Sequence, residues 1–314
     1  MLRPVQALLL SSALLCVPFR LAAQSPGRPK ITGIATVAVY ASDLDKAQQF
    51  YEAFLGFPPA RPEETRSSRQ YRVNASQSIQ VRPLPSGETD DLAYVAFATS
   101  DAHALRKYLL SKNVPVQGSV QARADGAQFL LVNDPEGHRI EFIQLPRRRP
   151  SLLHAGQHPR PKEQPVSHHI LHAGFIVHDR AAEDRFYRDV LGFRVAWYGG
   201  MVDGRTDFVD MQVPDGTDWL EYMLHSSSPP TPAVSGILNH FALGVGDIHQ
   251  AADLLQQRGW HPSSRSHAQI GRDGKWQLNL FDPNGTRVEL MELRPVQTPC
   301  CSPYTVPVPP PDRP

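Results

Sequence analysis

The chain repeats itself, and this constrains its fold more than any other feature. The segment DKAQQFYEAFLGF, which starts at Asp45, returns as AAEDRFYRDVLGF from Ala181. The segment VNDPEGHRIEFIQL from Val132 returns as LFDPNGTRVELMEL from Leu280. Self-similarity at this scale indicates that one structural unit occurs more than once in the chain. We therefore expect two related domains rather than two unrelated ones.

The positions of the repeated segments also predict where these domains begin and end. They span residues 31–146 and 169–294, which agrees with the two domains implied by a length of 314 residues. Residues 147–168 between them are rich in proline and charge, which predicts a linker. The proline-rich tail, 295–314, is expected to be disordered or extended.

Each domain divides again into two similar halves. The stretch LNHFALGVGDIHQAADLL predicts a strand that starts at Leu238 and a helix that starts at Ile248. A helix predicted over 43–55 carries apolar residues at helical spacing and ends at Gly56. Short strands follow, and NDPEGH and FDPNGT are tight turns between them. The pattern predicts an α+β fold of four βαβββ units.

The N-terminal residues are typical of an export signal. Arg3 supplies a positive charge, the apolar stretch 5–17 is too short to span a bilayer, and small residues near Ala23 suit cleavage. We expect residues 1–23 to be removed, leaving a secreted or periplasmic protein that is not attached to a membrane. The alternative is an N-terminal anchor that stays attached.

The charge of the chain argues against one class of partner, and its cysteine content argues against a disulfide framework. The net charge is +1, and no basic stripe is interleaved with aromatic residues, which argues against a nucleic-acid partner. Cys16 lies in the predicted signal, and Cys300 and Cys301 are adjacent in the tail. Neighbouring cysteines bond to each other only with strain, so we expect no disulfide framework.

These motifs resemble the vicinal oxygen chelate superfamily, which includes glyoxalase I, fosfomycin and bleomycin resistance proteins and extradiol dioxygenases. The FYxxxLGF helix ends and the DPxGxxxE closing hairpins carry the resemblance, which covers nearly all of residues 31–294. The resemblance implies two glyoxalase-like domains, in each of which a pair of units forms a cupped sheet with a divalent metal at its base. It also implies that metal ligands come from the first and last strand of each unit.

The second domain has a histidine or a glutamate at all four of these positions. His172 and Glu221 are separated by 49 residues, as are His240 and Glu289, as two copies of one unit require. The strand period of two would aim them at one centre. Two imidazoles and two carboxylates suit one divalent ion, Zn, Ni, Mn, Fe or Co, with positions left for substrate oxygens. The competing interpretation is structural histidines and exposed strand carboxylates.

The first domain differs at the equivalent positions. They hold Thr36, Gln80, Tyr94 and Glu141, of which Glu141 alone is a good metal ligand. One carboxylate does not hold a metal ion. We therefore expect this domain to be structural or to shape the entrance for the substrate.

Membership of such a superfamily does not fix the reaction. The first hypothesis is a lyase or isomerase resembling glyoxalase I, in which the metal polarises a carbonyl or enediolate oxygen and Glu289 or Glu221 moves a proton. The second is an extradiol dioxygenase, although Glu221 and Asn279 stand where that group places an acid–base histidine and a tyrosine. The third is a non-catalytic protein that binds a small molecule, as in bleomycin resistance; transferases and hydrolases remain. We expect a small-molecule substrate, and either a monomer, which would be an internal pseudo-dimer, or a homodimer.

Overall fold

The computed structural model describes residues 26–60, 68–88, 92–146, 164–224 and 231–306. The predicted signal segment, 1–23, lies outside these ranges, as does most of the predicted linker. Among the described residues, the structure has no helix that is both long and apolar enough to cross a membrane.

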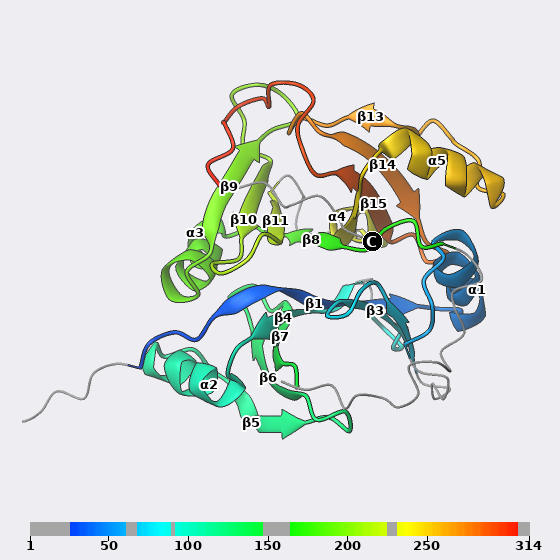
Figure 1. Cartoon of the computed structure of the whole chain (residues 1–314). Coiled ribbons are helices and arrows are strands. Elements are labelled where there is room, and N and C mark those ends of the chain that lie inside the picture. Colours follow the sequence, from blue (N-terminus) through cyan, green and yellow to red (C-terminus); the bar gives the residue numbers. More distant parts are fainter. Residues whose placement is uncertain (1–25, 61–67, 89–91, 147–163, 225–230, 307–314) are drawn as a thin grey trace, which may run out of the picture.

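The first domain is built on one curled sheet of seven strands, in the order β2-β3-β1-β4-β7-β6-β5 (Figure 1). Strands β1 and β4 open the two units and pair antiparallel at the centre, and each pairs parallel with the last strand of its own unit. The elements are β1 (Ile31–Ala41), α1 (Leu44–Gln48), the π-helix η1 (Gln49–Phe54), β2 (Arg69–Arg72), β3 (Ser78–Pro83), β4 (Leu92–Thr99), α2 (Ala102–Ser111), β5 (Gln117–Ala122), β6 (Gln128–Asn133) and β7 (Arg139–Gln144).

The second domain has an eight-stranded sheet of the same plan, in the order β13-β14-β15-β12-β8-β11-β10-β9. Strands β8 and β12 now occupy the antiparallel centre. The elements are β8 (Ile170–Ile176), α3 (Arg180–Asp184), the π-helix η2 (Arg185–Val190), β9 (Arg194–Gly199), β10 (Phe208–Gln212), β11 (Trp219–Met223), α4 (Pro232–Leu238), β12 (His240–Val245), α5 (Ile248–Gln257), β13 (Gln269–Ile270), β14 (Trp276–Phe281) and β15 (Arg287–Glu292).

Four helices, one from each unit, begin in the same way. Asp43, Asp101, Asp179 and Asp247 each accept hydrogen bonds from backbone N–H groups of the first helical turn. An aspartate at this position satisfies donors that a helix start otherwise leaves unpaired. The repeat therefore includes the aspartate that caps the start of each helix. One prediction was wrong in detail, because Leu238 ends helix α4 and the strand begins at His240.

The two domains hold each other through reciprocal contacts. Tyr51 in η1 donates a hydrogen bond to Asp282, in the last turn of the second domain (3.1 Å). Tyr187 in η2 donates in the same way to Asp134, in the equivalent turn of the first domain (3.1 Å). The tyrosine of each FYxxxLGF motif thus reaches the DPxG turn of the other domain. One hydrophobic core runs through both domains between these contacts.

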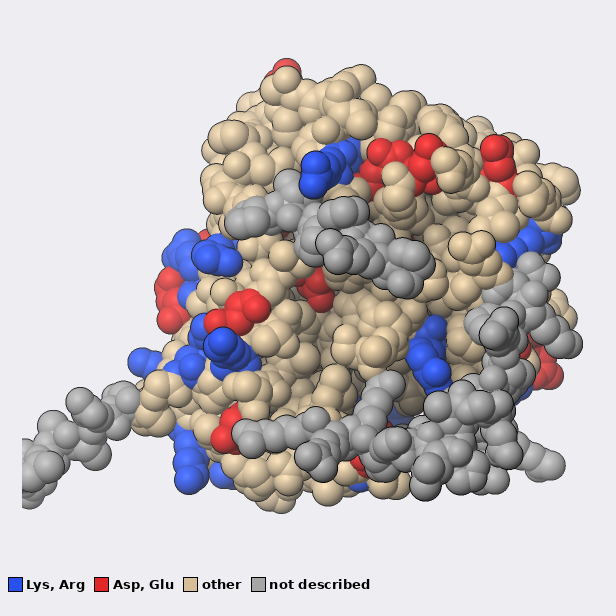
Figure 2. All heavy atoms as spheres, in the orientation of Figure 1, with Lys and Arg blue, Asp and Glu red and all other residues tan. Residues whose placement is uncertain are grey.

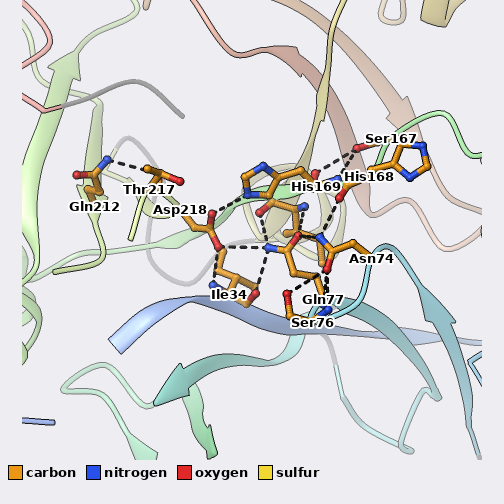
Figure 3. Close-up of polar contacts among 11 residues, drawn as sticks. Ile34, Asn74, Ser76, Gln77, Ser167, His168, His169, Gln212, Thr217 and Asp218 are labelled. Atoms are coloured by element: carbon orange, nitrogen blue, oxygen red, sulfur yellow. Dashed lines mark hydrogen bonds and ion pairs between the residues drawn. The ribbon is translucent and has the colours of Figure 1, made fainter. Parts of the chain in front are cut away.

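A second, polar contact between the domains surrounds Gln77 (Figure 3). The Gln77 amide nitrogen donates to the carbonyl of Ile170 (3.0 Å), and its oxygen accepts from the N–H of that residue (2.9 Å). Asp218 accepts from Ile34 N–H (2.7 Å) and lies 2.8 Å from His169 Nε2. These bonds replace water for buried polar groups, so the domains are joined by satisfied contacts rather than by apolar packing alone.

The end of the described chain packs against the second domain. Residues 295–306 form no helix or strand, in keeping with the extended alternative, but they contact both β9 and the turn between β13 and β14. Cys300 and Cys301 are joined by a disulfide, which the sequence did not lead us to expect. Because the bond joins adjacent residues, it links no distant elements.

Candidate metal centre

The four predicted ligands come together on one face of the second sheet. His172 lies on β8, Glu221 on β11, His240 on β12 and Glu289 on β15. These are the four central strands of the sheet, adjacent in the order β15-β12-β8-β11. The strand alternation that predicted a common face therefore also brings the side chains to a common point.

The distances between the ligand atoms suit a shared ion. His240 Nε2 lies 3.0 Å from His172 Nε2 and 3.1 Å from Glu221 Oε2. Glu289 Oε2 lies 3.5 Å from His172 Nε2 and 3.7 Å from His240 Nε2. Ligands bound about 2.1 Å from one ion in tetrahedral or octahedral geometry lie roughly 3.0 to 3.4 Å apart. His172, Glu221 and His240 form the tightest group, and Glu289 contacts both imidazoles.

A glycine makes room for the second imidazole. Gly174 lies opposite His240 in the β8–β12 pairing. A Cβ atom at Gly174 would lie 2.1 Å from His240 Cε1, far inside any real contact. The ring of His240 can therefore occupy its position only because residue 174 has no side chain.

A hydrogen bond on the far side of the His240 ring orients it for metal binding. Its Nδ1 lies 2.8 Å from the carbonyl of Leu238, which assigns the proton to Nδ1 and leaves the lone pair of Nε2 facing the centre. Arg287 donates to that same lone pair (2.6 Å). One lone pair cannot accept from Arg287 and bind a metal at once, so the guanidinium and an ion compete for His240.

Burial sets the protonation of the ligands. Desolvation, to which the charge of Arg287 adds, lowers the pKa of both His172 and His240 well below the usual range. Both imidazoles are therefore neutral, as metal ligands must be. Desolvation raises the pKa of Glu289 to about 8, with Arg287 opposing the shift and Glu221 adding to it. Despite the positive charges of Arg287 and Lys275, this carboxyl keeps its proton at neutral pH unless a further cation binds beside it.

The charges around the centre do not balance by themselves. Desolvation, with Glu221 and other carboxylates nearby, raises the pKa of Asp210 well above its usual range. Fully ionised, the group carries four negative and two positive charges, so one divalent cation would make it neutral. Burying unbalanced charge is costly, so the donor set and its charge both fit a divalent ion. The acids are Asp210, Glu221, Asp273 and Glu289, and the bases are Lys275 and Arg287.

The equivalent face of the first domain is organised differently. Glu141 accepts two hydrogen bonds from Arg123 Nη2, at 2.6 and 2.8 Å. Tyr94 donates to Gln80 (2.8 Å), and the hydroxyl of Thr36 lies 3.1 Å from that of Ser78. A guanidinium thus neutralises the one carboxylate that the predicted positions supply. This arrangement supports a structural role for the domain.

Several residues near the centre were not predicted from the sequence. Lys275 is buried, with its ammonium 4.6 Å from the ring centre of Trp219, whose ring lies 5.1 Å from that of His172. Strand alternation could have found Arg287, which lies two residues from Glu289 on the same strand. Lys275 lies in a turn, for which alternation gives no direction, and Gly174 has no side chain to reveal its role.

Comparison with known proteins identifies the family. The profile of the Glyoxalase/Bleomycin resistance protein/Dioxygenase superfamily matches residues 33–142 and 167–290. These two segments make up most of the chain, and the protein belongs to this superfamily. A search of curated proteins found no match.

Solved structures of extradiol dioxygenases share the fold of both domains. Homoprotocatechuate 2,3-dioxygenase from Brevibacterium fuscum, in its anaerobic complex with 3,4-dihydroxyphenylacetate, is 20% identical with a TM-score of 0.62. That match covers 86% of this chain and 82% of the other. The native enzyme from Arthrobacter globiformis is 19% identical with a TM-score of 0.62, covering 85% and 81%. The predicted α+β fold of two glyoxalase-like domains is confirmed by this likeness.

Metal binding by the second domain should release a proton from Glu289. Its pKa of about 8 in the metal-free protein means that the carboxyl is neutral below that pH, whereas a ligand must be ionised. The apparent affinity should therefore rise about tenfold per pH unit from pH 6 to 8 and level off above. Calorimetric titration with Zn²⁺ in two buffers of different ionisation enthalpy measures the released protons. Binding that is independent of pH across this range would contradict the assignment.

Proposed function

We propose that the protein is a metal-dependent lyase or isomerase of the glyoxalase type, acting on a small substrate with a carbonyl or enediolate oxygen. The observation that carries this proposal is Glu221, a second carboxylate whose Oε2 lies 3.1 Å from His240 Nε2. A divalent ion held by the four ligands would supply a Lewis acid for the substrate oxygen. The reaction then needs a base beside the adjacent carbon.

Glu221 is better placed than Glu289 to be that base. The side chain of Glu221 is 15% exposed, whereas that of Glu289 is 4% exposed. Glu289 also lies between both imidazoles, which suits a residue that holds the centre together. Glu221 therefore takes the proton from carbon and returns it, and the buried pair of histidines stays neutral throughout.

The proposal is tested by exchange of a carbon-bound proton. The metal-loaded protein is incubated in D₂O with small α-hydroxycarbonyl compounds, and loss of the carbon-bound proton is followed by NMR. Replacing Glu221 with glutamine removes the base but keeps an oxygen that can bind the metal. We expect exchange to fall at least about 100-fold in Glu221→Gln, the range typical of a lost general base. Metal analysis of the same samples distinguishes loss of the base from loss of the bound metal.

Extradiol ring cleavage is the second candidate. It is favoured by the likeness of both domains to homoprotocatechuate 2,3-dioxygenases over most of the chain. Against it, Glu221 and Asn279 stand where ring cleavage would need an acid–base histidine and a tyrosine, and Asn279 pairs with Glu289 across the β14–β15 ladder. We expect no oxygen uptake with catechols by the iron-loaded protein. Metal-dependent uptake with a yellow ring-opened product would reverse this ranking.

A further inference from the structure

One of the two tyrosine contacts between the domains carries additional charged groups. There the turn aspartate, Asp134, lies beside His138, with its Oδ2 2.7 Å from the imidazole Nδ1. The buried carboxyl of Glu183 approaches both from α3 of the second domain. One ligand atom from each of these three residues lies within 4.8 Å of the others. The three residues, here called the junction cluster, therefore come from both domains.

The other tyrosine contact forms without these groups. In the repeated segments, Ala47 occupies the position of Glu183, and Thr286 occupies the position of His138. The turn itself is unchanged, because Thr286 N–H donates to Asp282 (3.0 Å) as the N–H of His138 does to its own turn aspartate (2.8 Å). The fold of the contact therefore requires neither the carboxyl nor the imidazole of the junction cluster.

Glu183 has an oxygen whose bonding capacity is unused. The residue is 0% exposed, and its Oε1 accepts a hydrogen bond from Glu136 N–H (3.0 Å). Its Oε2 is buried and has no hydrogen-bond partner among the described residues. Desolvation, with the charge of Asp134 adding to it and that of His138 opposing it, raises the pKa of Glu183 to about 8. A buried acceptor without a partner is costly, so this oxygen suits a bound cation.

The basic side chains of the same helical segment are paired elsewhere. Arg188 contacts Asp184 at 3.4 Å and Asp189 at 2.8 Å. Figure 2 shows acidic and basic side chains next to each other on the surface over this segment. In the part of the chain that the structure describes, no lysine or arginine forms an ion pair with Asp134 or Glu183. The junction cluster therefore has two carboxyls and only an imidazole to balance them.

The junction cluster and the predicted metal centre lie on opposite faces of the second sheet. Tyr187, which donates to Asp134, has its ring centre 6.1 Å from that of Tyr222 on β11. Tyr222 directly follows the predicted ligand Glu221, and successive side chains of a strand point to opposite faces of a sheet. An ion at the junction cluster would therefore contact none of the four predicted ligands.

We propose that the junction cluster is a second, weaker site for a divalent cation, which ties α3 of the second domain to the β6–β7 turn of the first. Two carboxylates and one imidazole suit an ion such as Mn²⁺ and balance its charge. The ion would displace the proton that His138 shares with Asp134 and the proton of Glu183. This inference is independent of the proposed reaction.

The donor set also predicts how firmly the ion is held. Three protein donors hold a divalent ion less firmly than the four of the metal centre, so we expect a Kd on the order of 10⁻⁴ M. Gel filtration should remove an ion held this weakly. Protein purified without added metal should therefore retain only the ion of the metal centre.

The test is a Mn²⁺ titration of the full chain with Zn²⁺ already in its metal centre. Zn²⁺ binds such donors more tightly than Mn²⁺, so the centre keeps its ion, while gel filtration empties the weaker site. Bound Mn²⁺ is counted at about pH 8 under argon by loss of the free-ion EPR signal, since the ligands must be deprotonated. We expect about one Mn²⁺ per chain. Glu183→Gln should bind it at least about tenfold more weakly, because it loses a charged ligand.

The repeat supplies variants that should fold. Glu183→Ala and His138→Thr introduce the residue types of the uncharged contact, Ala47 and Thr286, and each should lose Mn²⁺ binding. Asp189→Asn removes a carboxylate of η2 that is 52% exposed, and should bind Mn²⁺ as the wild type does. Mn²⁺ at about 5 mM should raise the Tm of the wild type and of Asp189→Asn but not of Glu183→Ala, because an ion bound only by the folded chain stabilises it.

Two results would overturn the inference. If the zinc-loaded wild type binds no Mn²⁺, protons alone balance the junction cluster. If the wild type and Glu183→Ala bind Mn²⁺ equally well, the ion lies elsewhere. Elemental analysis of the same samples measures Zn²⁺ in the metal centre. Absence of Zn²⁺ there would contradict the proposed function instead, so the failures of the two proposals are distinguishable.

Discussion

Replacing His240 with alanine should reduce bound divalent metal from about one ion per chain to less than about a tenth of that, because even outer-shell changes typically cost 10- to 100-fold in affinity. The variant loses a neutral nitrogen that lies within 3.1 Å of both His172 and Glu221. It leaves two carboxylates around a weakened centre. The fold should survive, since its core lies between the sheets and helices rather than at this face.

Glu141→Gln is the matched control for this result. Glu141 occupies the same strand position in the first domain as Glu289 does in the second, but Arg123 already neutralises it. Its replacement should leave metal content unchanged. Elemental analysis of wild type and both variants, purified without chelator, makes the measurement. Two metals per chain, or full occupancy in His240→Ala, would show that the assigned ligands are wrong.

Gly174→Ala should weaken metal binding by about 100-fold without changing any ligand, because displacing a ligand resembles losing it. The added methyl group would meet His240 Cε1 at 2.1 Å, so the ring must move. The bond from Nδ1 to Leu238 holds the ring in place, so movement breaks that bond and turns Nε2 away from the centre. Competition with a coloured Zn²⁺ chelator measures the affinity.

Gly246→Ala provides the comparison for this variant. Gly246 lies just after β12, and a Cβ atom there would meet no atom within 4 Å. This change should leave metal affinity within about twofold of the wild type, as expected for a surface substitution without new contacts. If both glycine variants bind metal equally well, the space beside Gly174 does not position His240.

The sequence predicted the four candidate ligands because they lie at repeated positions on regular strands. Strand alternation predicts the face of the sheet on which a side chain lies, and the repeat predicts the spacing between equivalent residues. His172 and His240 could therefore be placed without knowing the packing. Neither rule says how far a side chain reaches. Arg287 lies on the same face as Glu289, yet its contact with His240 depends on a long side chain whose direction only the packing decides.

The direction of side chains in turns and in the tail could not be predicted from the sequence, for a different reason. Lys275 and Tyr304 lie outside helices and strands, where no period relates position to direction. Their contact joins the tail to the turn between β13 and β14, with the Lys275 ammonium 4.6 Å from the ring centre of Tyr304, and such a long-range contact cannot be predicted from local sequence. The proline-rich composition of the tail predicted a disordered or extended segment but none of its contacts, and residues 295–306 form no helix or strand.

Each domain donates a tyrosine hydrogen bond to a turn of the other, and this contact gives the first domain a role that its ligand positions do not reveal. Tyr51 bonds to Asp282 and Tyr187 to Asp134, so the same patch on each half meets its counterpart, as in an isologous dimer. Such a contact needs two partners, whether or not both carry out chemistry. The first domain acts as a permanent, covalently attached subunit. Removing the first domain would therefore remove the hydrogen bonds that Tyr187 and Asp282 make to it, whether or not that domain binds a metal ion.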